Sequence, residues 1–160
     1  MPTLSPEAER TLLGGEDYEQ LVIFRFVHWI LYLHENQAHL GRAYAWLATR
    51  HVDLHQLHDL AAEERDELDE VMRHYRSALD ALWKPDLVNC CWLGNEYGVH
   101  RGHGHMHLIP RYARPPKMLD FGRRHFDDTC FGRNYTHAPK RVLLPEELEH
   151  IRKQIEQRFT

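Results

Sequence analysis

The sequence predicts a single α+β domain built on an antiparallel sheet. Several apolar segments are rich in β-branched and aromatic residues, one long segment has the periodicity of an amphipathic helix, and a second helical pattern closes the chain. Few helices and several strands joined by short connections favour an antiparallel sheet. At 160 residues the chain is long enough to bury one core, so we expect one domain over residues 1–160.

The N-terminal third predicts a short helix followed by strands. Ser5-Pro6 and the acidic residues after them indicate a helix start, which predicts a helical extension over about residues 1–15. The segment "LVIFRFVHWILYL" (21–33) has the composition of a strand. After a loop, "RAYAWLA" (42–48) alternates imperfectly between apolar and polar residues and predicts another strand.

The remaining elements are two helices and a hairpin. Apolar residues recur at helical spacing over about residues 60–83, and acidic residues crowd the first half of that segment. The apolar run "DLVNCCWLG" (86–94) predicts a buried strand, which we expect to pair as a hairpin with a strand over about residues 103–110. An apolar stripe then predicts a C-terminal helix over about residues 145–159.

Composition and charge narrow the class of protein. A net charge of −4 and a pI near 6.4 argue against a nucleic-acid-binding protein. No signal-peptide pattern and no apolar run long enough to cross a bilayer are present in the sequence. Cysteines are odd in number and two are adjacent, which favours reduced thiols: Cys90, Cys91 and Cys130. We therefore expect a cytoplasmic protein with neither nucleic acid nor membrane as partner.

Histidine is concentrated in the stretch "GVHRGHGHMHLIPRY", where His103, His105 and His107 alternate. On a strand these three side chains share one face, and the outer two lie about 13 Å apart along the backbone. A tetrahedral metal needs its nitrogens about 2 Å from one point, so three ligands from one straight strand are awkward. We expect no metal site here, although a His-x-His pair with one distant ligand stays open: His51, His55 or His58.

A row of imidazoles suits an extended anionic substrate. One imidazole can act as a nucleophile, and a second can donate a hydrogen bond to the group that gains negative charge. Phosphoric anhydrides are suitable substrates for such a row, because phosphoryl transfer depends mainly on positioning and charge stabilisation. Arg101 and Arg111 flank the row and could add fixed positive charge, with solvated surface arginines as the alternative.

The stretch "HGHMHLIPRY" resembles the signature of the histidine triad superfamily, in which three histidines alternate with hydrophobic residues. The surrounding blocks "HENQAHLGRAYAWLATRHVDLHQL", "AAEERDELDEVM", "LVNCCWLGN" and "FGRNY" are similar to a bacterial diadenosine-polyphosphate-hydrolase-like branch, over about residues 28–135. The resemblance implies an antiparallel sheet of about five strands with a long helix and a C-terminal helix. It also implies a homodimer.

The resemblance further implies an activity on nucleotides. Members of this superfamily hydrolyse or transfer at the α-phosphate of dinucleoside polyphosphates, nucleoside phosphoramidates or adenylated compounds, through a covalent nucleotidyl-histidine. In this chain the middle histidine, His105, would be the nucleophile. His103 would orient the site, and His107 would contact phosphate or the leaving group.

Substrate contacts are implied for residues outside the row. Asn95 follows the strand before the triad, and Arg42 stands where the family has an upstream phosphate-facing histidine. Asn36 is a candidate for ribose or phosphate contact, and Arg101 and Arg111 for phosphate. We expect no cofactor held by the protein, with Mg²⁺ entering only on a polyphosphate substrate.

Two features depart from the family pattern. Gly104 stands where a hydrophobic residue is expected, and the spacer before the triad carries an extra histidine, His100. Both motivate an alternative, a nucleotide-binding sensor with negligible catalysis. A histidine-ligated metalloprotein is the further alternative. His51 belongs to a block that matches a structural corner before the long helix.

Overall fold

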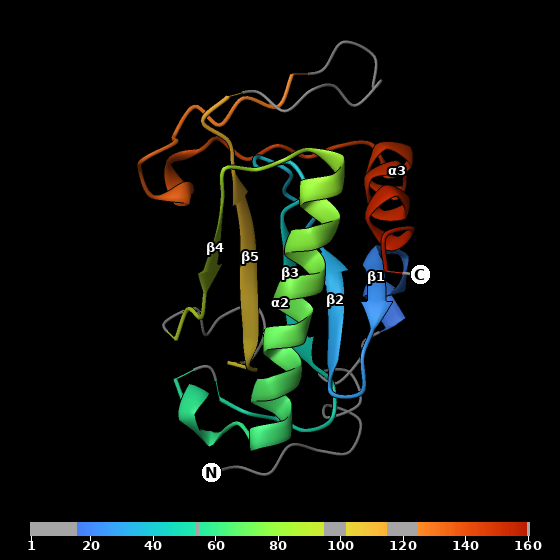
Figure 1. Cartoon of the computed structure of the whole chain (residues 1–160), viewed down its shortest axis with the longest axis vertical. Helices are drawn as coiled ribbons and strands as arrows, with labels where there is room; N and C mark the ends of the chain where they lie inside the picture. Colours follow the sequence, from blue (N-terminus) through green and yellow to red (C-terminus); the bar gives the residue numbers. More distant parts are fainter. Residues whose placement is uncertain (1–15, 54, 95–101, 115–124, 160) are drawn as a thin grey trace.

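One antiparallel sheet organises the molecule in this computed structural model, which describes residues 16–53, 55–94, 102–114 and 125–159. Its five strands follow the order β1-β2-β3-β5-β4, and every neighbouring pair is antiparallel (Figure 1). The strands are β1 (Val22–Arg25), β2 (Trp29–Leu33), β3 (Ala43–Leu47), β4 (Leu87–Cys91) and β5 (His105–Arg111). The predicted α+β class and number of strands are therefore confirmed.

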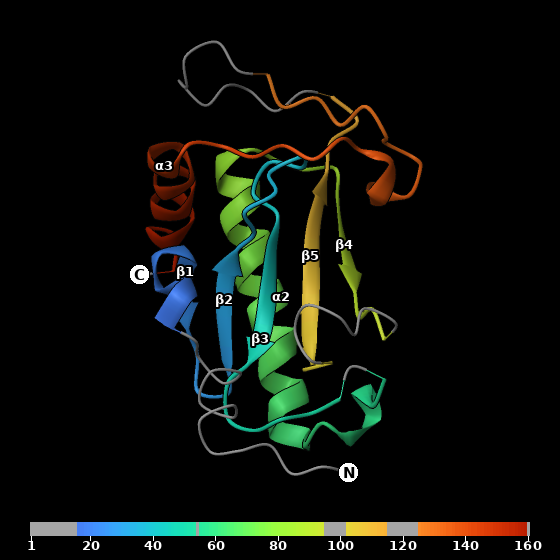
Figure 2. The ribbon, with the colours of Figure 1, turned by 180° about the vertical axis from the view of Figure 1, so that it is seen from behind.

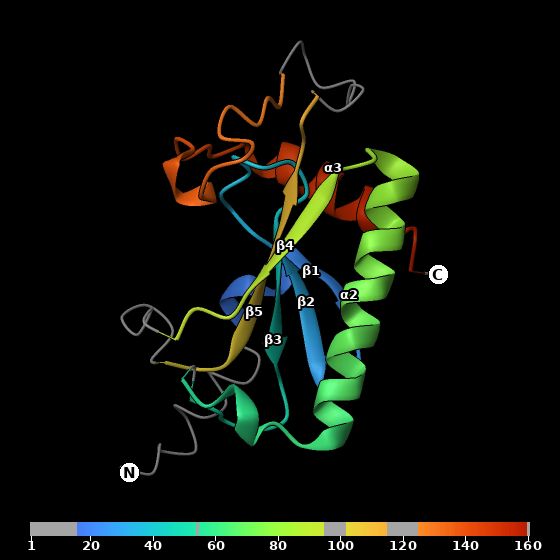
Figure 3. The same ribbon diagram turned by 60° about the vertical axis from the view of Figure 1, so that its left-hand side comes forward.

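Two helices pack on this sheet. The long helix α2 (Ala62–Leu82) runs along one face, and α3 (Pro145–Glu156) lies beside β1 at one edge (Figures 2 and 3). Three short 3-10 helices complete the described elements: η1 (Glu16–Leu21), η2 (Leu57–Asp59) and η3 (Tyr135–His137). Within the described ranges, no helix is long and apolar enough to cross a membrane.

The main core lies between α2 and the sheet. It contains the helix residues Val71, Tyr75 and Leu79, together with alternate residues of the central strands. The buried Tyr75 hydroxyl donates a 2.7 Å hydrogen bond to the carbonyl of Gly41. Gly41 has a φ of +85°, and a Cβ atom there would lie 2.9 Å from the Trp83 ring. This tight turn sets the start of β3, because only glycine fits both the backbone and the close approach.

The continuous strand that we predicted over residues 21–33 is wrong. The segment forms the end of η1, then β1 and β2, which are joined by a turn. The carboxylate of Glu67, on α2, accepts hydrogen bonds of 2.5–3.1 Å from the backbone N–H groups of Val27, His28 and Trp29. Composition did not reveal the turn, because its donors are satisfied by a carboxylate about 40 residues away in the chain.

The hairpin of β4 and β5 is confirmed in its pairing, with Cys91 opposite His107 and Leu87 opposite Arg111. Its connection, residues 95–101, and the predicted helical extension over residues 1–15 lie outside the described residues. His103 precedes the regular part of β5 and forms an isolated antiparallel bridge with Asp53. The start of the triad therefore pairs with the segment after β3.

Candidate active site

The alternating histidines lie at the start of β5, on the face of the sheet turned away from α2. Met106 and Leu108 pack in the same core as α2, so His105 and His107 project from the opposite face. Their rings are 4.7 Å apart between centroids. His103, His105 and His107 are all buried, with exposed fractions of 0%, 1% and 5%. The strand thus presents an ordered and enclosed imidazole row.

Backbone carbonyls determine which ring nitrogens carry protons in this row. His105 Nδ1 lies 2.9 Å from the carbonyl oxygen of His103, and a carbonyl can only accept, so Nδ1 carries the proton. The lone pair of neutral His105 is then on Nε2. That atom lies 3.1 Å from Nε2 of His107, which is therefore the donor of this contact. The arrangement aims the basic nitrogen of His105 at an N–H group of His107.

His103 is held from the other side of the row. Its Nε2 atom donates to the carbonyl oxygen of Leu47 at 2.7 Å, and its Nδ1 atom lies 3.0 Å from Nδ1 of His51. Nε2 of His51 in turn lies 3.2 Å from Oδ1 of Asp53. Sequence reasoning assigned His51 to a structural corner and did not consider Asp53. The only local signal was the short run "RHVD" (50–53), shortly after β3.

Aromatic side chains of β3 border the histidine row. Trp46 is opposite His105 in the strand register, and its ring centroid lies 5.4 Å from that of His105 and 4.6 Å from that of His103. Tyr44 is opposite His107 and stacks on Tyr32 at 5.3 Å. Burial raises the pKa of Tyr44 above its ordinary value, so this hydroxyl stays protonated at neutral pH.

Gly104 has a packing reason for its small size. A Cβ atom at this position would lie 2.7 Å from Cη2 of Trp92 and 3.1 Å from the carbonyl oxygen of Val52. The N–H of Gly104 donates to that same Val52 carbonyl at 2.6 Å. Trp92, just after β4, therefore occupies the space that a larger residue between His103 and His105 would need.

Solved structures of other proteins share this fold. A hypothetical histidine triad nucleotide-binding protein from Sulfolobus tokodaii matches with a TM-score of 0.64 and 16% identity, covering 86% of this chain and 82% of that one. A histidine triad protein from Bradyrhizobium japonicum matches with a TM-score of 0.62 and 13% identity, covering 87% and 90%. The chain has the histidine triad fold.

A third structure, a zinc-bound histidine triad family protein from Mycobacterium smegmatis, matches with a TM-score of 0.55 and 17% identity, covering 86% of this chain and 84% of that one. No family model and no curated protein matches the sequence. The diadenosine-polyphosphate-hydrolase-like branch therefore stays a prediction. Among the described residues of this histidine triad fold, no group of three or more metal-ligating side chains is placed to hold a metal ion.

Arg42 lies close to the histidine face of the fold. It directly precedes β3, is 8% exposed, and its guanidinium carbon lies 5.2 Å from the centroid of the Tyr135 ring. Burial raises the pKa of the Cys91 thiol, and the positive charge of Arg42 opposes that rise. Arg42 directly precedes Ala43, which pairs with Leu108, so its backbone lies beside the His107 end of the row.

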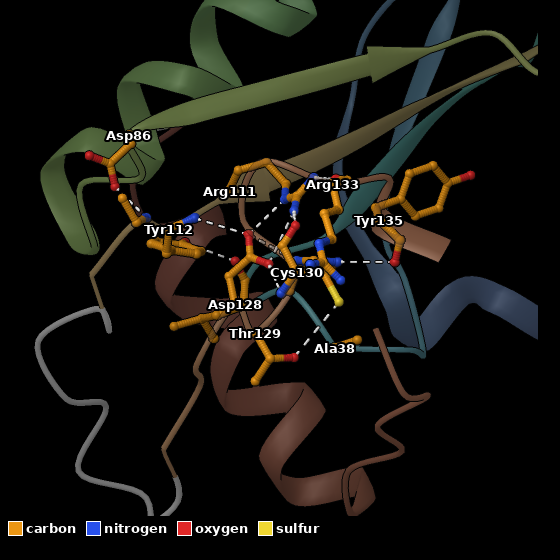
Figure 4. A network of polar contacts seen from close by, with 12 residues as sticks. Ala38, Asp86, Arg111, Tyr112, Asp128, Thr129, Cys130, Arg133 and Tyr135 are labelled. Atoms are coloured by element: carbon orange, nitrogen blue, oxygen red, sulfur yellow. Dashed lines mark hydrogen bonds and ion pairs between the residues drawn. The ribbon is translucent and has the colours of Figure 1, made fainter. Parts of the chain in front are cut away.

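Asn36 and Arg111, two predicted substrate contacts, both have partners within the protein. Oδ1 of Asn36 accepts from the backbone N–H groups of Ala38 and Arg141, at 3.0 and 2.9 Å. Arg111 forms a bidentate pair with Asp128, at 2.6 and 3.1 Å, and also donates to the carbonyls of Cys130 and Arg133 (Figure 4). The side chains of both Arg111 and Asp128 are buried. Both residues thus have contacts within the protein, and their roles as substrate contacts stay predictions.

Two other predicted substrate contacts, Asn95 and Arg101, lie outside the described residues, as does His100. The site as described thus combines the predicted row with Arg42. It adds Trp46 and Asp53, which were not predicted, and His51, which was considered only as a distant metal ligand. Arg111 belongs to a buried ion-pair network with Asp128 at the end of β5.

Proposed function

We propose that the chain is a nucleotide hydrolase or nucleotidyl transferase. Its substrate would be a dinucleoside polyphosphate, a nucleoside phosphoramidate or an adenylated compound, cleaved at the α-phosphate. The observation that carries this proposal is the contact of His105 Nδ1 with the His103 carbonyl, which leaves the basic nitrogen of His105 directed toward His107. The fold shared with a hypothetical histidine triad nucleotide-binding protein supports the same substrate class.

In the proposed first step, Nε2 of His105 attacks the α-phosphorus, and the bond from phosphorus to the leaving group breaks. The new N–P bond places positive charge on the His105 ring, and the His103 carbonyl stabilises that charge through Nδ1–H. His107, 3.1 Å away and in its imidazolium form, gives the departing oxygen or nitrogen a proton. Arg42 would add positive charge for the phosphates at the same end of the row.

In the second step, water attacks the phosphorus of the nucleotidyl-histidine, and the N–P bond to His105 breaks. His107, neutral after the first step, takes the proton released by the water. The products are a nucleoside monophosphate and the free enzyme, with His107 protonated again. With a different acceptor in place of water, the same steps would transfer the nucleotidyl group.

The test compares wild type with His105→Ala on a panel of adenosine polyphosphates and phosphoramidates. We expect rapid acid-free quench to trap a nucleotidyl adduct on wild type and none on the variant. A matched control is His58→Gln, because His58 is 80% exposed at the side chain and lies on a separate short helix. Turnover that survives His105→Ala unchanged would contradict the nucleophile.

A nucleotide-binding sensor with negligible catalysis is the second candidate, and one observation favours it. His105 is only 1% exposed and stacks on Trp46, so a substrate can reach Nε2 only after side chains move. Calorimetry with nucleotides and rapid quench separates the two candidates. Tight binding with no adduct would support the sensor, whereas an adduct that turns over supports the enzyme.

We also propose that the protein acts as a cytoplasmic homodimer and that Mg²⁺ enters only with a polyphosphate substrate. The exposed side of β4 supports self-association: it is an edge strand, with Leu87 56% exposed and Cys90 exposed as well. An uncovered edge strand can pair with a second copy. Light scattering at micromolar concentration would contradict the homodimer if only a monomer of 19.1 kDa were found.

A further inference from the structure

A second pair of histidines lies end to end at the start of the row. Nδ1 of His51 is 3.0 Å from Nδ1 of His103, and the two rings are 5.1 Å apart between centroids. Each outer nitrogen has an oxygen partner: Nε2 of His103 meets the Leu47 carbonyl at 2.7 Å, and Nε2 of His51 meets the Asp53 carboxylate at 3.2 Å. The chain of contacts therefore runs from a carboxylate through two imidazoles to a backbone carbonyl.

This series of contacts requires a definite number of N–H groups. The Leu47 carbonyl and the Asp53 carboxylate only accept, so each needs an N–H from its histidine. The contact between His51 and His103 needs one more N–H. Three N–H groups on two rings are one more than two neutral imidazoles hold. The complete set of hydrogen bonds therefore forms when the pair carries one extra proton, with the negative charge of Asp53 beside it.

The backbone of the same segment is also tied to the triad. Asp53 forms an antiparallel bridge with His103, and the carbonyl of Val52 accepts from the N–H of Gly104 at 2.6 Å. Residues 51–53 thus hold both the ring and the main chain at the first position of the triad. The carbonyl of His103 is the group that fixes His105 through its Nδ1 atom. A displacement of His103 would therefore move or release His105.

We propose that His51 and Asp53 are positioning residues of the active site, which lock the His103 ring between two oxygens so that its carbonyl stays on His105. The inference rests on the proposed function, since it concerns how the nucleophile is held. The pair is also accessible to solvent, with side-chain exposures of 27% for His51 and 11% for Asp53. The extra proton can thus exchange with water while His105 and His107 stay enclosed.

The chain offers a matched control for this pair. Nε2 of His58 lies 3.4 Å from Oδ1 of Asp59, but these side chains are 80% and 49% exposed. The control pair has the same chemistry, a similar distance and a place in the segment shortly after His51 and Asp53. A surface contact of this kind contributes little to stability. Variants of His58 and Asp59 therefore report what loss of a histidine–aspartate contact does away from the triad.

Steady-state kinetics on an adenosine phosphoramidate tests the positioning role with Asp53→Asn and His51→Gln. We expect kcat to fall on the order of 10- to 100-fold, because a small displacement of a reacting group is enough for such a loss. KM should stay within about twofold of wild type, since these residues do not touch the substrate. Asp59→Asn and His58→Gln should behave as wild type. Unchanged kcat in both test variants would overturn the proposal.

A measurement on the unaltered protein keeps the proposal falsifiable if a variant fails to fold. With ¹⁵N-labelled imidazoles, one low-field proton should couple to Nδ1 of both His51 and His103. Its absence in wild type would overturn the proposal whatever the turnover. If the shared proton is present but no substrate gives an adduct or turnover, the proposed function fails and the histidine pair stands. If an adduct forms but the shared proton is absent, the proposed function stands and the positioning role of His51 and Asp53 fails.

Discussion

Nδ1 of His105 lies 2.9 Å from the carbonyl oxygen of His103, so one residue of the triad determines the tautomer of the next. The relationship depends on the backbone of His103 more than on its ring. It explains how a backbone carbonyl can leave a buried imidazole with a basic Nε2 atom. It also makes the role of His107 separable from that of His105, because His107 meets the opposite nitrogen at 3.1 Å.

The first prediction concerns His107 as proton donor. In His107→Ala, a nucleotide ester of an acidic phenol should still form the adduct on His105, because a phenolate leaves without a proton. A phosphoramidate or an alcohol ester should react at least about 100-fold more slowly than in wild type, since its leaving group needs a proton. Rapid-quench kinetics on both substrates measures the difference. Equal losses on the two substrates would contradict the assignment of His107.

The second prediction concerns the packing of Gly104 against Trp92. Gly104→Ala places a Cβ atom 2.7 Å from Cη2 of Trp92, and overpacking of this kind costs about 1–3 kcal/mol of unfolding free energy. Trp92→Phe removes the outer ring that causes the clash. The double variant should therefore recover part of the loss, as measured by denaturant unfolding. If the two effects simply add, the proposed contact between these residues is wrong.

The third prediction concerns the buried pair of Arg111 and Asp128. Their side chains are 4% and 1% exposed, so Asp128→Asn leaves a buried guanidinium without its counter-charge. We expect a loss of about 3–5 kcal/mol in unfolding free energy. The matched control is Asp69→Asn, which breaks a pair with Arg73 whose side chains are both 64% exposed. That change should cost less than about 1 kcal/mol.

The fourth prediction concerns pH. Burial lowers the pKa of His39 from its ordinary value of 6.5, and the nearby Asp128 opposes the shift. A base with a lowered pKa binds more protons unfolded than folded, so its contribution to stability is lost as pH falls through about 6.5 toward the folded pKa. The unfolding free energy should therefore be lower at about pH 5.5 than at about pH 7.5.

A variant isolates the contribution of His39 from those of the other histidines. His39→Gln should narrow the difference in unfolding free energy between the two pH values, whereas His58→Gln, at an exposed position, should leave it unchanged. Asp128 affects stability in a lower range of pH. Arg111 and His39 hold its pKa below 3.8 against the effect of burial, so its contribution is lost only in stronger acid. An undiminished difference in His39→Gln would contradict the assignment.

Local patterns predicted the elements whose partners are close in the sequence. The helical spacing over residues 60–83 became α2 (Ala62–Leu82), because the repeat of an amphipathic helix is written in consecutive residues. Alternation likewise predicted that His105 and His107 share a face. The prediction of one strand over residues 21–33 was wrong, because the chain turns at Val27 and His28, where a carboxylate on α2 accepts their backbone hydrogen bonds.

Residue type alone was a poor guide to individual contacts around the site. Asn36 and Arg111 have the chemistry of phosphate ligands, and in the structure they also contact the backbone N–H of Arg141 and the carboxylate of Asp128, both distant in sequence. Neither partner could be assigned from a pattern, because nothing in the local sequence specifies which distant group will meet a buried donor. The same limit concealed Asp53, whose place beside His51 follows from the bridge to His103.

The sequence by itself determined the α+β class, the long helix, the hairpin that carries the triad and the fact that His105 and His107 share a face. These features follow from periodicity and strand alternation, which act over a few residues. Only the tertiary structure decided which nitrogen of His105 is basic and which residues support His103. Hydrogen bonds between segments settle such questions, because a ring's tautomer depends on the acceptor that the fold brings to it.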